Sequence, residues 1–218
     1  MRRAAVFAAA AGAAALCASA SAGPAPEEAP ERKVLALPGG VELALVRLPG
    51  GPWLGETEVT QEQWTSVMGS NPSEYAMTNH PVESVAFDGA VAFCTALGAL
   101  PGVAETGLSF RLPTDGEWER ACLAGAERPP AGPGLDKTAA HRENARGLHV
   151  EAGSLEPNAF GLRDMLGNVW EWVESPDGHV MRGGCAFTPP EDFQPLPRAV
   201  RNAPGYAHFG LGFRVAAQ

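Results

Sequence analysis

Between residues 60 and 123, the apolar positions recur mostly at three- and four-residue intervals, the spacing of buried helix faces. Thr60 with Gln63, and Thr114 with Glu117, have the sequence of a capping box, which starts a helix by satisfying its free amide groups. Trp64 then begins the inner face of the first helix. We expect a helix from Thr60 to just before Gly69, and further helices over residues 84–97 and 115–123. The apolar residues of the second helix are Val85, Phe87, Val91, Phe93, Cys94 and Leu97.

Short strands are predicted in most of the remaining chain. Residues 34–48 alternate loosely between apolar and polar and predict a strand or hairpin, and later apolar runs are separated by glycine and proline. Residues 126–156 are the least regular part. Helices in the first half and short strands in the second favour an α+β fold in a single compact domain. The later strands are expected at residues 108–112, 169–173, 179–182, 198–201 and 212–216.

The N-terminal segment has the pattern of a signal peptide. Arg2 and Arg3 precede an Ala-rich apolar run, and residues 20–22 form a small-residue cleavage site. We predict a signal peptide at residues 1–22, a Pro/Glu-rich linker at 23–33 and a domain at 34–218. An N-terminal core helix is one alternative, and lipid attachment at Cys17 is another. Leu16 stands where lipidation requires a small residue, so we favour cleavage and a secreted or periplasmic protein.

Charge and composition narrow the classes of partner. The formal net charge is −9, and removal of the signal peptide takes away basic residues only. An acidic chain is a poor candidate for binding nucleic acid or anionic membranes. After the N-terminus, no apolar run approaches the roughly 20 residues of a membrane span. The 26 glycines and 20 prolines indicate a domain rich in loops.

Three cysteines remain beyond the predicted signal peptide: Cys94, Cys122 and Cys185. An odd number leaves at least one thiol unpaired, or paired with another chain. Spacing cannot decide whether Cys94 and Cys122 form a disulfide bond or stay as buried thiols. The five histidines have no metal-ligand spacing.

Residues 158–172 are the least ordinary stretch. Gly161 and Gly167 are unfavourable in a helix, and Asp164 is unfavourable in a strand. Two tryptophans flank Glu171. We expect a structured loop running into a strand, serving either as a knot of the scaffold or as an ion site.

Six motifs, in this order, closely resemble the formylglycine-generating enzyme, or sulfatase-modifying factor, family. The resemblance covers nearly all of the predicted mature chain and implies a C-type-lectin-like topology with little regular structure and bound calcium. Enzymes of this family oxidise a cysteine of a client sulfatase to formylglycine, using oxygen and a copper ion held by two cysteines. Other members of the family serve different chemistries, or are binding modules that keep only the fold. The motifs are E-V-T at 58–60, H-P-V at 80–82, R-L-P-T-D-G-E-W-E at 111–119, residues 158–172, R-G-G at 182–184 and G-F-R-V at 212–215.

The chain departs from the enzymes at the catalytic cysteines. The matching positions lie near Thr188 and Phe193, and Cys185 is the one cysteine in this region. Linear copper binding needs two soft ligands, so copper is not expected. The loop after the third helix and the segment before Glu58 are also shorter than in the family.

The resemblance implies a calcium site formed by the carboxylates of Asp164 and Glu171 and the carbonyl groups of Gly167 and Val169. Calcium prefers several hard oxygen ligands in flexible geometry, and a Gly-Asn turn can direct two carbonyls to one point. The alternative is that the two carboxylates only cap backbone amides. A second calcium site of the family would use Asn144, but its partner loop is missing here.

Two further groups of residues have open interpretations. Cys185 is either a reactive thiol in a pocket or a small buried residue, and we favour the second. Arg198, Arg201 and Arg214 either recognise an acidic ligand or pair with acidic residues of the scaffold, among them Glu119, Glu171 and Glu174. We favour ion pairing.

Two hypotheses for function follow. The first is a non-catalytic binding or accessory module with a structural calcium ion, whose partner is a protein, peptide or glycan in the export compartment. The second is an oxygen-dependent oxidase with a divergent site around Cys185. The sequence favours the first, because the second catalytic cysteine is missing.

Overall fold

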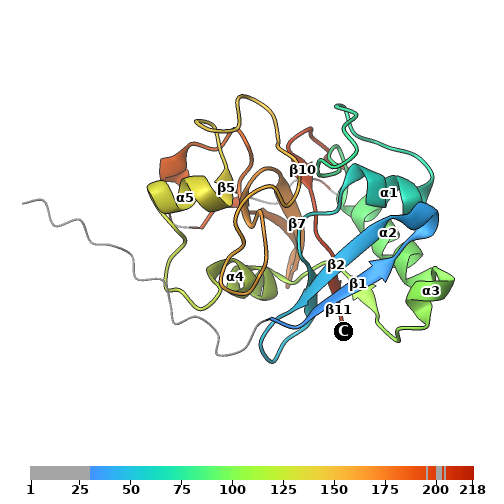
Figure 1. Cartoon of the computed structure of the whole chain (residues 1–218). Helices are drawn as coiled ribbons and strands as arrows, with labels where there is room; N and C mark the ends of the chain where they lie inside the picture. The colour runs from blue at the N-terminus through green and yellow to red at the C-terminus, as the bar shows by residue number, and fades with distance from the viewer. Residues whose placement is uncertain (1–29, 195, 200–202, 204) are drawn as a thin grey trace, which may run out of the picture.

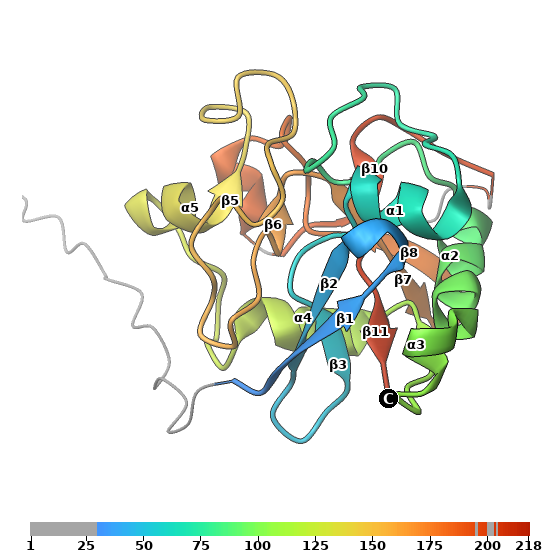
Figure 2. The same ribbon diagram turned by 45° about the vertical axis from the view of Figure 1, so that its right-hand side comes forward.

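The computed structural model describes residues 30–194, 196–199, 203 and 205–218. The predicted signal peptide at 1–22, Cys17 and most of the predicted linker lie outside the described residues. Helices α1, α2 and α3 gather at one end of the molecule, and α5 and β5 lie at the other (Figures 1 and 2). The α+β prediction is confirmed. The helices are α1 Gln61–Met68, α2 Phe87–Ala99, α3 Pro101–Ala104, α4 Asp115–Leu123 and α5 Pro133–Thr138, with short 3-10 turns at Pro38–Gly40 and Pro190–Phe193.

Both predicted capping boxes are present. Thr60 and Gln63 bond reciprocally at the start of α1, as Thr114 and Glu117 do at the start of α4. The second predicted helix begins at residue 87 instead of 84, because Ser84 has a positive φ of 60° and the backbone of Ala86 is extended. Val91 of this helix is exposed. Helices α3 and α5 were not predicted.

A five-stranded sheet, in the order β1-β2-β3-β11-β4, is built from both ends of the described chain. The predicted hairpin is formed by β1 and β2, and β1 begins at Arg32, two residues before the expected start of the domain. The last strand lies antiparallel between β3 and β4. The strands of this sheet are β1 Arg32–Ala36, β2 Glu42–Arg47, β3 Trp53–Gly55, β4 Phe110–Arg111 and β11 Ala216–Ala217.

A four-stranded sheet, in the order β10-β7-β8-β9, carries the Trp-Glu-Trp run on its strand β7. The expected strand at 212–216 is in fact two strands: β10 pairs in parallel with β7, whereas β11 joins the five-stranded sheet. The members are β7 Trp170–Ser175, β8 Gly178–Arg182, β9 Arg198–Ala199 and β10 Leu211–Gly212, and a separate pair is formed by β5 Ala139–Ala140 and β6 Leu166–Gly167.

The core has two main apolar clusters, on opposite sides of β7. Trp172 packs in one cluster with Phe93 and Phe213, and its neighbour Val173 packs in the other with Trp118. This alternation is that of a strand with both faces buried. Residues of β7 that lie between the two clusters are therefore held rigidly.

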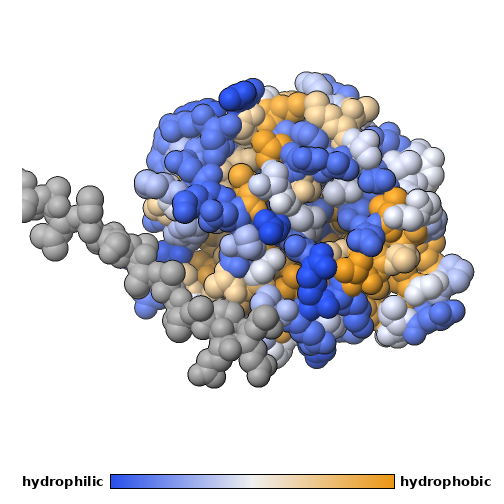
Figure 3. Space-filling view, viewed as in Figure 1, coloured by the Kyte–Doolittle hydropathy of each residue, from blue (hydrophilic) through white to orange (hydrophobic). Residues whose placement is uncertain are grey.

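On the face of the molecule in Figure 3, hydrophobic surface gathers over α1, α2 and the β1–β2 hairpin.

Candidate functional site

Residues 158–168 form a loop that is held by its own polar groups. The side-chain oxygen of Asn158 accepts hydrogen bonds from the amides of Phe160 and Leu162, at 3.0 and 3.1 Å. Asp164 and Asn168 both have a positive φ, of 56° and 54°. These two residue types tolerate the left-handed region better than most, which explains their place in the loop.

Glu171 lies at the centre of the molecule, in a buried ion pair with Arg214. The guanidinium Nε donates to Oε2 and Nη2 donates to Oε1, each at 2.7 Å, and the indole N–H of Trp118 donates to Oε2 at 2.8 Å. Glu171 is 1% exposed and Arg214 is fully buried. The predicted pairing of Arg214 with a scaffold carboxylate is thus present, and Glu171 is its partner.

Two more carboxylates are buried close to this pair. The Oδ2 atom of Asp164 accepts a hydrogen bond from the amide of Gly153 at 2.5 Å, and its Oδ1 atom has no partner. Neither oxygen of Glu58 has a partner, and its side chain is fully buried. Burial raises the pKa of Asp164 to about 6. Burial, together with the charge of Asp164, raises the pKa of Glu58 well above its ordinary value.

The other two predicted calcium ligands lie on β6 and just before β7. Gly167 pairs with Ala140 of β5, and a Cβ atom at Gly167 would be 1.9 Å from the Ala140 carbonyl oxygen, so glycine is required there. Val169 is buried. Among the described residues, three or more His, Cys, Asp or Glu side chains are nowhere grouped to hold a metal. The calcium site remains a prediction.

The structure places Cys185 in a small buried turn. Its amide donates to the hydroxyl of Thr188 at 2.9 Å, and that hydroxyl lies 3.9 Å from the sulfur. Phe193 is fully buried in the core cluster that contains Trp118. Near the positions that are predicted to match the enzymes' cysteines, the structure therefore has a hydroxyl that orders the turn and a ring that fills the core.

A group of aromatic side chains covers the surface beside Cys185, and we call it the aromatic platform: Tyr75, Phe187, Tyr206, His208 and Phe209. The ring of Phe209 lies at its centre, with its centroid 6.1 Å from Tyr75, 5.3 Å from Phe187 and 4.1 Å from His208. Tyr206 stacks on His208. Three of the five large exposed hydrophobic residues of the described chain belong to this group. Sequence reasoning missed the platform because its members come from three separate segments.

The loops that carry the platform lie side by side above β10 (Figures 1 and 2). They are tied by the hydrogen bond from the Ser84 amide to the His208 carbonyl, at 3.1 Å. Two histidines lie beneath Tyr75. The Nδ1 atoms of His80 and His149 are hydrogen-bonded at 2.9 Å. Burial, and to a lesser degree the charge of His80, lowers the pKa of His149 to about 4. This histidine pair, 69 residues apart in the chain, gave no signal in the sequence.

Arg198 also pairs with a carboxylate of the scaffold. Arg198 bonds to Asp115 on the surface, while Arg182 reaches both Asp115 and Glu119 from a buried position. Arg201 lies outside the described residues. The interpretation as scaffold ion pairs therefore holds for Arg198, with Asp115 as its partner.

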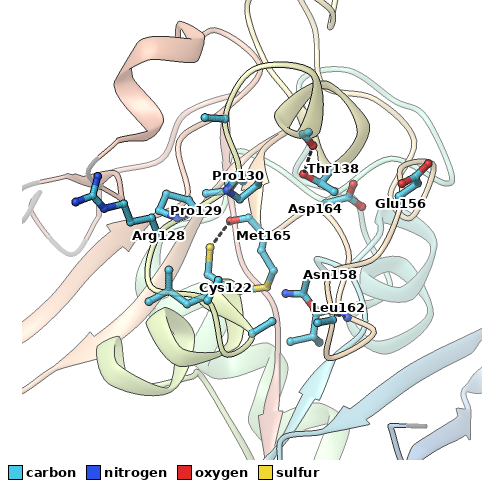
Figure 4. Close-up of a pocket in the computed structure, with 17 residues that line it drawn as sticks. Cys122, Arg128, Pro129, Pro130, Thr138, Glu156, Asn158, Leu162, Asp164 and Met165 are labelled. Atoms are coloured by element: carbon cyan, nitrogen blue, oxygen red, sulfur yellow. Dashed lines mark hydrogen bonds between the residues drawn. The ribbon is translucent and has the colours of Figure 1, made fainter. Parts of the chain in front are cut away.

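A pocket with a volume of about 480 Å³ lies between α4, α5 and residues 156–166. Figure 4 shows Cys122 in its wall, with the sulfur directed at the Met165 carbonyl oxygen, 3.9 Å away. The lining is mainly apolar. The Asn158 side-chain amide in the wall is already bonded to the Ala121 carbonyl. All three described cysteines are buried and none forms a disulfide bond.

Two known proteins are similar to part of this chain in sequence. The formylglycine-generating enzyme of Mus musculus is 31% identical over 203 residues, which cover 76% of this chain and 51% of the mouse protein. The protein named serine/threonine-protein kinase pkn1 of Chlamydia pneumoniae is 34% identical over 167 residues, which cover 66% of this chain and 25% of that protein. The chain thus spans between a quarter and a half of these relatives' lengths.

Solved structures agree on the fold. Treponema denticola variable protein 1 aligns with a TM-score of 0.71 at 24% identity, over 85% of this chain and 98% of that one. PvdO from Pseudomonas aeruginosa aligns with a TM-score of 0.62 at 21% identity, over 87% and 92%. The profile of the sulfatase-modifying factor enzyme 1-like domain matches residues 22–218. This chain therefore belongs to the sulfatase-modifying factor enzyme 1-like domain family.

Proposed function

We propose that this protein is an exported, non-catalytic member of its family, and that it binds a peptide or glycan partner through the aromatic platform. The observation that carries the proposal is the gathering of exposed rings around Phe209. Aromatic rings offer a large contact area with few rotatable bonds, so they are enriched at binding surfaces. Such a surface suits a ligand with a flat apolar face, such as a sugar ring or an aromatic side chain.

The surroundings of Cys185 support a role other than oxidation. Copper in a linear site needs two thiolates, and Thr188 and Phe193 occupy the matching positions. Phe193 also packs against Gly184, where an added Cβ would be 2.9 Å from the ring. A second cysteine in place of Phe193 would leave a cavity in the core.

An oxidase with a divergent site is the second candidate. One observation favours it: the sulfur of Cys185 lies beneath the platform, 3.6 Å from where a Cβ of Gly210 would be. A substrate bound on the platform would then lie close to this thiol. Such an enzyme would need a redox metal with other ligands.

Export is part of the proposal and rests on the predicted signal peptide at residues 1–22. None of the helices in the described part of the chain has the length and hydrophobicity needed to cross a membrane. Mass spectrometry of the protein recovered from the export compartment should give a chain that starts at Gly23. Retention of residues 1–22 would contradict export, and an added lipid mass on Cys17 would indicate a membrane anchor.

The relatives offer limited support for a binding role. A protein named chaperone protein LppX, from Paenibacillus barcinonensis, is 27% identical over 181 residues, covering 57% of this chain and 64% of that protein. Its name describes an accessory role rather than a reaction. For our chain, that role is an inference.

Peptide and glycan arrays, followed by calorimetry, test the platform. Binding should fall at least tenfold in the triple variant Tyr75→Ala, Phe187→Ala, Tyr206→Ala, because truncating central interface aromatics typically costs 1–2 kcal/mol or more. The matched control is Val34→Ala with Val91→Ala, which removes exposed apolar side chains elsewhere and should leave binding unchanged. If the triple variant bound the ligand as tightly as the wild type, the proposed role of the platform in binding would be wrong.

The oxidase is tested separately, by incubating the protein with Cu(I), oxygen and a C-x-P-x-R peptide. We expect no aldehyde product. Oxygen-dependent conversion that is lost on Cys185→Ser would replace the binding proposal with the second candidate.

A structural calcium ion completes the proposed function. The family resemblance suggests it, and unpartnered oxygens of Glu58 and Asp164 are compatible with it.

A further inference from the structure

The pocket between α4, α5 and residues 156–166 lies apart from the aromatic platform and shares no residue with it. Its volume of about 480 Å³ falls within the roughly 300–1,000 Å³ of small-molecule sites. The apolar side chains of its wall come from α4, from the loop after α4 and from residues 158–166 (Figure 4). They include Leu123, Pro129, Pro130, Leu162, Met165 and Leu166. Such a wall suits an apolar ligand.

Most polar groups of the wall are already engaged by the protein itself. The side-chain amide of Asn158 donates to the Ala121 carbonyl oxygen at 2.8 Å, and the hydroxyl of Thr138 donates to the Gly134 carbonyl oxygen at 3.2 Å. The sulfur of Cys122 is directed at a carbonyl oxygen 3.9 Å away. A well-ordered buried water needs two to four polar partners, so water is held weakly here. Replacing weakly held water by an apolar group gains affinity.

Two side chains of opposite charge stand at the mouth of the pocket. Arg128 and Glu156 are both exposed, and they lie on opposite sides in Figure 4. Glu156 lies 3.9 Å from Lys137, which matches its charge. No ion pair to Arg128 is formed by the residues that the structure describes, and Glu127 lines a neighbouring cleft instead of this pocket. The mouth therefore has one unmatched positive charge.

Asp164 is the buried carboxylate of the wall, with 1% of its surface exposed. Its Oδ2 atom accepts from the Gly153 amide, and its Oδ1 atom is the oxygen compatible with the proposed calcium ion. An anionic group would be repelled from this inner carboxylate and attracted to Arg128 at the mouth. The charges thus favour a ligand with a negative end outside and apolar atoms inside.

We propose that the pocket binds the alkyl chain of a medium-chain carboxylic acid, whose carboxylate lies at the mouth beside Arg128. The guanidinium matches a carboxylate in geometry as well as in charge. Each methylene group that leaves water for the apolar wall adds about fourfold in affinity. The site is separate from the aromatic platform, so the inference goes beyond the proposed function and does not depend on it.

The carboxylate end is tested by calorimetry of the full-length protein with decanoate, decanol and decyltrimethylammonium, each below the concentration at which it aggregates. We expect decanoate to bind most tightly, although decanol is more apolar. Arg128→Ala should weaken decanoate binding by about two- to fivefold, the range of an exposed ion pair, and leave decanol binding unchanged. The control is Arg142→Ala, which removes an exposed arginine outside the pocket. Equal affinities for decanoate and decanol, or no effect of Arg128→Ala, would overturn the inference.

The apolar wall is tested by chain length and by filling the pocket. Affinity should rise by about fourfold for each methylene added from hexanoate to decanoate. Ala126→Trp places a large ring in the lining and should weaken decanoate binding by at least about tenfold. The matched control is Ala76→Trp, in the lining of a different pocket beside α1, and its affinity should equal that of the wild type. An unchanged affinity in Ala126→Trp would show that the chain binds elsewhere.

Hydrogen exchange of the wild-type protein gives a measurement that does not depend on the folding of Ala126→Trp. Decanoate should slow exchange in residues 123–131 and 158–166. Slowing confined to residues 206–210, or none at all, would overturn the inference. The triple variant of the aromatic platform should bind decanoate like the wild type, so a failure of the platform proposal and a failure of this one are told apart.

Discussion

Glu171 and Arg214, 43 residues apart in the chain, form a two-pronged ion pair at the centre of the molecule, with both contacts at 2.7 Å. The pair is closed on one side by the indole of Trp118. It holds β7 to the residues that follow β10. Its energetic role is a consequence of complete burial, because a charge left alone there cannot reach water.

Removing one partner should therefore cost more than removing both. We expect Arg214→Met to lower the free energy of unfolding by about 3–5 kcal/mol, since it leaves the Glu171 carboxylate buried and unpaired. The double variant Glu171→Leu, Arg214→Met should be clearly more stable than Arg214→Met alone. Urea unfolding measures both. Additive losses in the double variant would show that the two residues are not coupled.

Two glycines allow a matched test of backbone constraint. Gly167→Ala places a Cβ atom 1.9 Å from the Ala140 carbonyl oxygen at a φ of +76°, so we expect a loss of more than about 3 kcal/mol, or failure to fold. Gly116→Ala, inside α4 with open space around it, should instead stabilise the protein by about 0.5–1 kcal/mol. Thermal unfolding distinguishes them. Similar effects from both changes would contradict the close approach of β5 and β6.

His149 should make the protein lose stability in mild acid. Its pKa is lowered to about 4 in the folded state, from about 6.5 in the unfolded chain. The unfolded state therefore binds the proton first, and the contribution is complete above pH ~6.5 and is lost as the pH falls toward ~4. We expect this contribution to the free energy of unfolding to be about 2 kcal/mol. His149→Phe should flatten the unfolding free energy over this range, and parallel profiles for the two proteins would contradict the assignment.

The three described thiols should be unreactive in the native state. Cys94, Cys122 and Cys185 are all buried. Burial raises the pKa of Cys94 to about 12 and raises that of Cys122 further. The thiolate is the reactive form, so Ellman's reagent should label none of the three in the folded protein and all three in urea. Rapid native labelling of Cys185, abolished by Cys185→Ser, would identify a reactive thiol beneath the platform.

The best sequence predictions concerned structure that is held within a few residues. The capping boxes at Thr60 and Thr114 were confirmed because each closes its hydrogen bonds over three positions. The start of α2 was predicted three residues too early. The backbone turns at Ser84, so the helix starts later, and this turn is stabilised by a distant contact with His208.

In the candidate sites too, the sequence predicted local features and missed contacts between distant residues. The sequence indicated that residues 158–172 form a structured loop and that Asp164 and Glu171 are important in it. It named Glu171 among the possible partners of Arg214, but it did not indicate that Arg214 would take both oxygens of Glu171, or that Glu58 would be left buried without a partner. Such pairings depend on residues that are distant in the chain, and no local pattern encodes them.

The sequence by itself determined the family, the α+β class and the local starts and turns of the elements, because motif spacing and capping depend on neighbouring residues. Tertiary structure alone decided that residues 211–217 divide between two sheets, that five aromatic residues from three segments form one platform, and which buried carboxylates keep free oxygens. The physical reason is that each of these depends on which distant surfaces pack together, and on which charges that packing removes from water.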